Sequence, residues 1–325
     1  MPSVIRTYLF HPLYNYDKNK VNILKTLMVF IIILSHTYNE GVNCLLTYYG
    51  GRCLGWVTMW LFFAMSGYGL VHSVIRNPDY IKGFVPRSLT KLFVPYLLIF
   101  PCYLLYRVLH NIPIVFYNSV IYPTSWFIWC LALFYVFFAL VFSYSQRPVY
   151  VNVLLVSLLV IAYIACAHIL HLWWWPRHRY MVCPGFCIGM FFALFDKYFK
   201  KRMLVWQALI FLLILVFVVR NYVYSYSNNL SFASDIISCF LLMYIAPNFK
   251  ANKLTSFVSS ISLEMFLIQY IPIYFFITHK ECLPDRQPYF LCLLVVLSDI
   301  FLAYLFHKLV VVVRSFVDKL ICKVI

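Results

Sequence analysis

Runs of about twenty apolar residues recur along this chain from Val21 to Val313, and they constrain its fold more than any other feature. Backbone groups in hydrocarbon must satisfy one another, so segments of this kind cross a membrane as α-helices. We predict ten such helices, near 21–38, 53–75, 92–110, 125–144, 149–170, 181–196, 203–222, 231–247, 256–278 and 288–312. Because only 11% of the residues are charged and no hydrophilic stretch can bury its own core, the expected fold is an all-α polytopic membrane protein. We expect residues 1–325 to form a single integral-membrane domain, a bundle of about ten transmembrane helices that follows a short cytoplasmic segment, 1–20.

The Lys and Arg residues collect on one side of this predicted bundle. Eighteen of the 26 share that side: Arg6, Lys18, Lys20, Arg76, Lys82, Arg87, Lys91, Arg147, Lys197, Lys200, Lys201, Arg202, Lys250, Lys253, Lys308, Arg314, Lys319 and Lys323. Cytoplasmic loops carry the excess of Lys and Arg, so we predict that both termini are cytoplasmic. Topology also explains the net charge of +16 better than nucleic-acid binding does, because the cations do not share one soluble face.

The eleven cysteines do not form the pattern of a secreted disulfide scaffold. Five fall within apolar runs, where Cys behaves as a small hydrophobic residue: Cys102, Cys130, Cys166, Cys239 and Cys292. Cys183 and Cys187 lie one helical turn apart, but no second Cys or His pair is placed to complete a metal site. We therefore expect no metal.

The first predicted helix carries two basic side chains, Lys25 and His36, inside its apolar run. Eleven residues at about 100° each return to nearly the same helix face, and they separate the two side chains by about 16 Å along the axis. Titratable side chains in hydrocarbon are costly unless they face a cavity or a partner. The pair therefore predicts a phosphate anchor near the cytoplasmic end and a reaction centre further out, although a snorkelling lysine and a packing histidine remain alternatives.

Two further groups of side chains extend these predictions. Glu40 follows His36 by four residues, so its carboxylate is placed to orient the imidazole unless it is a plain loop residue. Arg87 and Lys91 share one face at the predicted entry to the third helix, and two cations at that boundary suit the phosphates of a nucleotide or coenzyme. Topogenic charge and contact with anionic lipid are the alternative for Arg87 and Lys91.

Other polar or small residues in the apolar runs have weaker signals. Glu264 sits near the middle of the ninth helix, where a carboxylate must be paired, neutral or hydrated. Asp299 in the tenth helix poses the same question, and its role stays open. Ser66 precedes a glycine that permits close helix packing, and Trp126 is placed as an interfacial aromatic residue.

Five segments together resemble the acyltransferase 3 family of membrane acyltransferases, which modify sugars and cell-surface polysaccharides. The segments are LKTLMVFIIILSH with its basic-x10-His pattern, FFAMSGYGL, PRSLTKLFVPY, SWFIWCLALFY and SLEMFLIQYIP, and their order spans most of the chain. The chain departs from the family pattern at Lys25, where Arg is usual, and at Gln269, where His is usual. We assign Gln269 no proton-transfer role.

The resemblance implies an O-acetyltransferase-like enzyme that moves an acyl group, first of all acetyl, from cytoplasmic acyl-CoA to a sugar or polysaccharide hydroxyl. His36 is then the catalytic base or a transient acyl carrier, with Glu40 holding its tautomer. By this resemblance, Lys25, Arg87 and Lys91 bind the phosphates of the co-substrate acyl-CoA, which we expect to be acetyl-CoA. Substrate or structural support comes from Ser66, Trp126 and Glu264.

The resemblance also sets the expected surroundings of the protein. We expect a plasma membrane, the inner membrane of a bacterium, with polysaccharide-biosynthesis proteins or a second copy of the chain as partners. Two alternatives remain, a transporter or flippase of a lipid-linked glycan or small anion, and a noncatalytic member of a polysaccharide-export complex. Broken helices in symmetry-related positions would favour the transporter hypothesis, and they are not evident in the sequence.

Overall fold

A computed structural model of the chain describes residues 18–109, 125–169, 181–199, 212, 228–245, 251–282 and 287–324. Every regular element in these ranges is helical. The long helices are α2 (Lys18–Asn39), α3 (Leu54–Arg76), α4 (Phe84–Leu109), α6 (Ser125–Tyr144), α7 (Val149–Ile169) and α15 (Pro288–Val324). Shorter ones are α9 (Pro184–Phe199), α11 (Asn228–Ile245), α12 (Lys253–Ser260), α13 (Ser262–Ile268) and α14 (Tyr270–Thr278). A π-helical turn, Leu46–Cys53, and two 3₁₀ turns, Pro78–Ile81 and Lys280–Cys282, lie between them.

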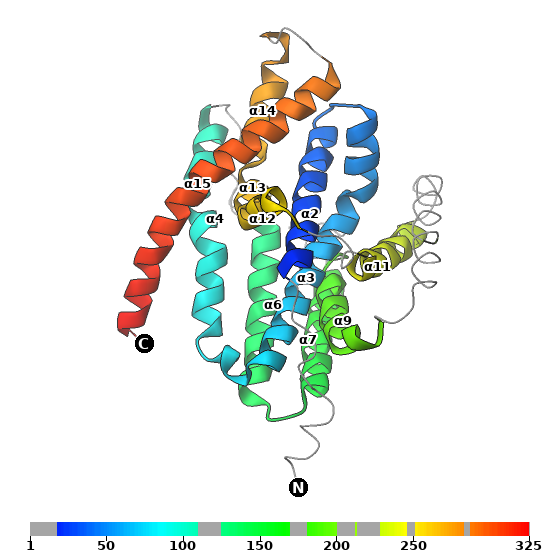
Figure 1. The fold of residues 1–325 in the computed structure, drawn as a ribbon, viewed down its shortest axis with the longest axis vertical. Helices are drawn as coiled ribbons and strands as arrows, with labels where there is room; N and C mark the ends of the chain where they lie inside the picture. Colours follow the sequence, from blue (N-terminus) through cyan, green and yellow to red (C-terminus); the bar gives the residue numbers. More distant parts are fainter. Residues whose placement is uncertain are drawn as a thin grey trace.

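The all-helical membrane architecture agrees with the sequence prediction. Within the described ranges, six helices are long and apolar enough to cross a membrane, namely the six long ones above. In Figure 1, α2, α3, α4, α6 and α7 run roughly along the long axis, whereas α15 crosses obliquely. The span predicted at 203–222 lies outside the described residues except for position 212.

The predicted ninth span, 256–278, is not one helix. It is divided into α12, α13 and α14, with the chain bending at Ile261, whose φ of −107° and ψ of 10° are not helical. At Gln269 the backbone stays near helical values, and the amide of Ile273 still bonds to the Gln269 carbonyl at 3.2 Å. The bend turns α12 away from α14, so that α12 is seen nearly end-on in Figure 1.

Helix α13 therefore lies inside the bundle, in contact with α2, α4 and α15. Six of its seven residues are buried. Helix α15 has 37 residues, a length of about 55 Å, and so extends well beyond the predicted end of the last span at residue 312. These two helices bring side chains from the last quarter of the chain to the face of α2.

Helices α3 and α9 pack backbone against backbone. A Cβ atom added at Gly67 would overlap the carbonyl oxygen of Phe186, and one added at Gly189 would overlap the carbonyl oxygen of Ala64. Only glycine permits an approach this close, which is the way membrane helices associate without a hydrophobic driving force. The close approach predicted beside Ser66 is thus confirmed at Gly67, with α9 as the neighbouring helix.

Candidate active site

Two side chains near the start of α2 form three hydrogen bonds that fix this helix against α12. Asn22 Nδ2 donates to Ser256 Oγ at 3.3 Å, and Ser259 Oγ donates to Asn22 Oδ1 at 3.0 Å. Thr26 Oγ1 donates to the carbonyl oxygen of Thr255 at 2.8 Å. These bonds set the rotation of α2, and with it the face on which Lys25 and His36 lie.

His36 lies against the junction of α13 and α14. Its imidazole stacks on the ring of Tyr270, with centroids 4.7 Å apart and planes inclined by 27°. It also interacts with the side chain of Gln269, the residue that stands where a histidine is usual in the family pattern. The two side chains do not form a well-directed hydrogen bond, because His36 Nδ1 and Gln269 Oε1 are each buried and neither has a partner of good geometry among the described residues.

Gln269 is held by its own helix. Its side chain is fully buried, and its Nε2 donates to the carbonyl oxygen of Phe266 at 2.7 Å. The carboxamide is therefore fixed while its oxygen remains an unused acceptor beside His36. This arrangement leaves Nδ1 of the imidazole able to accept or donate a proton in a new hydrogen bond.

Glu40 is close to His36 in the chain, but its carboxylate has a different partner. The Glu40 amide donates to the His36 carbonyl at 3.0 Å, which continues the turn at the end of α2. The carboxylate bonds to the side chain of Tyr274. Burial raises the pKa of Glu40 above its usual range, and the bond to Tyr274 opposes this shift. The predicted contact between Glu40 and the imidazole is not among the interactions described for either side chain.

Tyrosines surround this end of the site. Tyr274 stacks on Tyr106 of α4, with centroids 5.3 Å apart and planes inclined by 10°. The hydroxyl of Tyr103 donates to the carbonyl oxygen of Leu267 at 2.5 Å. Asp299 of α15 interacts electrostatically with Tyr103 and is fully buried, and neither of its carboxylate oxygens has a hydrogen-bond partner in the part of the chain that the structure describes.

Lys25, at the other end of α2, lies in a charged environment. Its ammonium interacts electrostatically with Lys91 of α4 and Glu264 of α13. Glu264 is only 5% exposed, and its Oε1 lies 2.7 Å from Nδ1 of His307 on α15. The buried carboxylate predicted at mid-span is thus paired, and it stands between a lysine and a histidine from two other helices.

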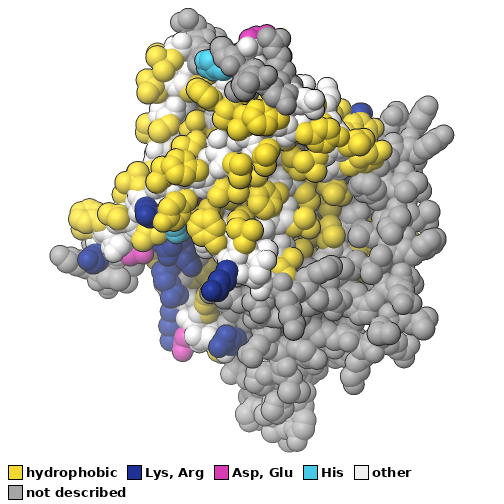
Figure 2. Space-filling model, turned by 45° about the horizontal axis from the view of Figure 1, so that its top comes forward, with side chains coloured by type: hydrophobic (Ala, Val, Ile, Leu, Met, Phe, Trp, Pro, Cys, Tyr) yellow, Lys and Arg dark blue, Asp and Glu magenta, His cyan; other side chains and the backbone are white. Residues whose placement is uncertain are grey.

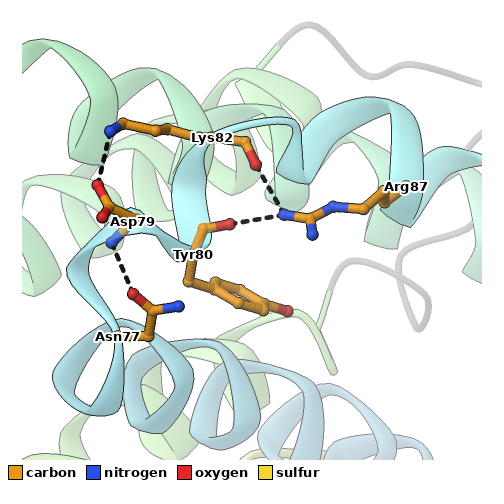
Figure 3. Close-up of polar contacts among 5 residues, drawn as sticks. All are labelled: Asn77, Asp79, Tyr80, Lys82 and Arg87. Carbon is orange, nitrogen blue, oxygen red and sulfur yellow. Dashed lines mark hydrogen bonds and ion pairs between the residues drawn. The ribbon is translucent and has the colours of Figure 1, made fainter. Parts of the chain in front are cut away.

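Arg87 is directed largely to the loop before α4. As Figure 3 shows, its guanidinium reaches back across the 3₁₀ turn. Nη2 donates to the carbonyl oxygens of Tyr80 at 3.0 Å and Lys82 at 2.7 Å, and Nε donates to that of Gly83 at 2.9 Å. Most of the N–H donors of Arg87 are therefore used in bonds to carbonyl oxygens of this loop. This makes Arg87 a weaker candidate for phosphate binding than Lys25 or Lys91.

Lys91 has a cationic neighbour that we did not predict as part of a site. It interacts electrostatically with Arg314 and Asp318 of α15 as well as with Arg87. Arg314 Nε lies 3.6 Å from Asp318 Oδ2, beyond hydrogen-bonding distance. Figure 2 shows Lys and Arg side chains gathered at one end of an extensive apolar face. We call Lys25, Lys91 and Arg314 the basic cluster.

The two remaining candidates lie in the packed bundle. Ser66 Oγ is 2.7 Å from the hydroxyl of Tyr135 on α6, so it joins two helices. Trp126 is only 7% exposed and packs beside Phe63 and Phe127. Neighbouring aromatic rings cover its side chain, and its position at the membrane interface stays a prediction.

Four side chains of α15 share one helix face, which we did not predict from the sequence. Cys292, Asp299, His307 and Arg314 follow one another at intervals of seven, eight and seven residues. Since about 7.2 residues make two helical turns, all four lie on one stripe of α15. A search for polar residues at this period would have found the stripe, whereas the distribution of charge alone suggested only a topological role for Arg314.

A family model described as an acyltransferase domain matches residues 18–312, nearly the whole chain. No curated protein and no solved structure shows significant similarity to this chain.

Proposed function

This chain belongs to the acyltransferase 3 family of membrane acyltransferases, and from that premise we propose that it carries an acyl group from acyl-CoA to a carbohydrate hydroxyl. We propose acetyl as the acyl group and a sugar or cell-surface polysaccharide as the acceptor. The observation that carries the proposal is the separation of Lys25, a member of the basic cluster, from His36 along one face of α2. Eleven residues of helix hold them about 16 Å apart.

The basic cluster supports the donor half of the proposal. Lys25, Lys91 and Arg314 come from α2, α4 and α15, and Lys91 is repelled by both of the others. Glu264 and Asp318 offset part of that charge, but Glu264 is also held by His307. A ligand with several phosphate groups, such as coenzyme A, relieves the repulsion by pairing with all three cations.

His36 supports the transfer half. With the phosphates at the basic cluster, the pantetheine arm extends along α2 and brings the thioester carbonyl to the imidazole. In direct transfer, His36 accepts the proton of the acceptor hydroxyl while the oxygen attacks the carbonyl carbon, and the thiolate of coenzyme A leaves and takes up a proton. In transfer through the enzyme, the imidazole nitrogen first attacks the thioester carbonyl and displaces the coenzyme A thiolate, which takes up the imidazole proton. The acceptor hydroxyl then attacks the acyl-imidazole, and its proton goes to the departing imidazole nitrogen.

The surroundings of His36 support a sugar acceptor. The stacked pair of Tyr106 and Tyr274 and the ring of Tyr270 supply aromatic faces beside the imidazole. Such faces pack on the apolar face of a sugar ring while their hydroxyls serve its polar edge. The predicted topology puts this end of α2 on the non-cytoplasmic side of the membrane, which we propose to be the plasma membrane.

Label transfer tests the proposed function. Purified protein is incubated with radiolabelled acetyl-CoA and a panel of glycan acceptors, and label is followed on both the acceptor and the protein. Native protein should transfer label and His36→Ala should not. His279→Ala should behave as native because His279 is exposed and its ring nitrogen bonds to the Phe275 carbonyl at the end of α14. Label retained on the protein would indicate an acyl-enzyme. Equal transfer by His36→Ala would overturn the role of His36, and absence of both transfer and coenzyme A binding would favour the transporter alternative.

A further inference from the structure

Cys44 lies in the turn that follows α2, four residues after Glu40. The backbone amide of Cys44 donates to Thr47 Oγ1 at 3.0 Å, and the thiol of Cys44 lies 3.5 Å from the same oxygen. Thr47 in turn donates to the Val42 carbonyl at 2.8 Å. Thr47 is thus anchored on the Val42 carbonyl and makes two contacts with Cys44, which fix the position of this cysteine in a turn that is not α-helical.

The thiol of Cys44 faces a second cysteine from the far end of the chain. Its Sγ lies 4.0 Å from Sγ of Cys292, which is in the second turn of α15 and only 2% exposed. Leu34, Val42 and Leu291 pack around the pair. The two residues are 248 positions apart in sequence, so their contact is a product of the tertiary fold.

The compartment in which this pair lies decides its chemistry. The predicted topology places the end of α2 and the start of α15 on the non-cytoplasmic side, where thiol pairs are oxidised and disulfides persist. A disulfide brings the sulfur atoms to about 2 Å, and two thiols already in van der Waals contact reach that distance with small changes in side-chain torsion.

We propose that Cys44 and Cys292 form a disulfide bond that links the turn after α2 to the start of α15. The oxidant is the disulfide of a thiol–disulfide exchange protein in that compartment. The Cys44 thiolate attacks one sulfur of that disulfide and forms a mixed disulfide while the other sulfur leaves as a thiolate. The Cys292 thiolate then attacks Cys44 Sγ, forms the bond and releases the second thiolate. Two thiols have lost two protons and two electrons, and the exchange protein has become a dithiol.

The order of these steps follows from exposure and hydrogen bonding. Cys44 is partly exposed whereas Cys292 is buried, so an exchange protein reaches Cys44 first. Partial burial would by itself raise the pKa of the Cys44 thiol, but hydrogen bonds from Thr47 and Leu46 outweigh it and lower that pKa. A thiolate at Cys44 is the attacking group that the first step needs.

Another pair of cysteines in the protein provides an internal contrast. Cys130 and Cys183 also interact, but both are buried in the core of the bundle, 1% and 0% exposed. An exchange protein cannot approach either sulfur there. We expect Cys130 and Cys183 to remain thiols in the same molecules in which Cys44 and Cys292 are oxidised.

Peptide mapping of the full chain tests the disulfide. Intact cells that express it are treated with N-ethylmaleimide before lysis, and the purified protein is digested without reductant for mass spectrometry. A linked pair of peptides containing Cys44 and Cys292 is expected, and it should disappear on reduction. Cells that lack the dithiol oxidase of that compartment should yield both cysteines as maleimide adducts.

Matched variants complete the test. Cys44→Ser should lose the linked peptides and leave Cys292 as an alkylatable thiol, whereas Cys166→Ser, at an exposed cysteine in α7, should keep the link. A reductant should lower the melting temperature of the native protein but not that of Cys44→Ser. Native protein in which Cys44 and Cys292 are both alkylated in cells, or in which Cys44 is linked to Cys53 or Cys282, would overturn the proposal. Because mapping needs no activity, its outcome is independent of the proposed function.

Discussion

The two ends of α2 offer different chemical environments on the same helix face. Around Lys25 the neighbours are the charged side chains of Lys91 and Glu264, and Lys91 in turn interacts with Arg314. Around His36 they are a stacked tyrosine ring and a buried carboxamide. Charged side chains attract a charged ligand electrostatically, whereas neutral and largely buried surroundings favour proton transfer by an imidazole held in one position. Under the proposed function, the Lys25 end of α2 sets the affinity for acyl-CoA and the His36 end sets the rate of acyl transfer.

Replacing His36 by Ala should have the largest effect and should act on rate alone. We expect kcat to fall by about 10²–10⁴-fold, the usual contribution of a positioned base, with the Kd for coenzyme A unchanged. Initial rates and equilibrium binding of labelled coenzyme A measure the two quantities separately. A loss of coenzyme A affinity equal to the loss of rate would break the division between the two ends.

Replacing Lys25 by Ala should give the opposite result. Loss of a charge-assisted contact of about 1.5–3 kcal/mol should raise the KM for acyl-CoA by roughly 10–100-fold with a small change in kcat. Lys25→Arg should retain function because it keeps the cation. Lys253→Ala, at an exposed lysine of α12, is the matched control and should leave KM unchanged. An unaltered KM in Lys25→Ala would remove Lys25 from the donor site.

Replacing Arg314 by Ala should sharpen the comparison through a smaller effect. This side chain is only partly buried, so we expect a rise of about 2–5-fold in the KM for acyl-CoA. The effect should shrink at high ionic strength, because salt screens partly exposed charges. Steady-state kinetics at two salt concentrations, with Lys319→Ala as the control on the same helix, measure it. A salt-independent effect would indicate a packing role.

Replacing Glu40 by Gln should have the smallest effect, on the pH dependence of stability. The pKa of Glu40 is raised in the folded protein, so that protein binds more protons than the unfolded chain between the two pKa values. Stability therefore falls as pH rises through that window, just above the ordinary range for Glu. Glu40→Gln should flatten this part of the profile, as measured by melting temperature against pH in detergent. An unchanged slope would show that another group is responsible.

Periodicity and hydropathy were enough to predict the long helices. The first predicted span, 21–38, agrees with α2 to within a few residues, because twenty apolar residues permit no other structure in a membrane. The face shared by Lys25 and His36 followed directly from that helix. The break at Ile261 could not be predicted in this way, since neither Pro nor Gly marks it in the sequence. The helix after the break, α13, packs among α2, α4 and α15.

Contacts between distant segments could not be read from the sequence. Glu40 was placed beside His36 by its spacing, yet Tyr274, from another helix, takes its carboxylate. The sequence around His307 and Arg314 gave no signal of a role in a binding site. Only the path of α15 brings His307 to Glu264 and Arg314 to Lys91. Spacing rules apply within one helix, whereas partners across helices depend on how the bundle closes.

The close contact of α3 with α9 has a consequence for biogenesis. Gly67 and Gly189 are 122 positions apart in the chain, so the glycine face of α3 enters the bilayer long before α9 is synthesised. Until then it is covered only by lipid tails or by the insertion machinery. A nascent chain that stops before Pro184 therefore exposes an unfinished helix surface on α3. Assembly of the bundle is a late event, completed only after the second half of the chain has left the ribosome.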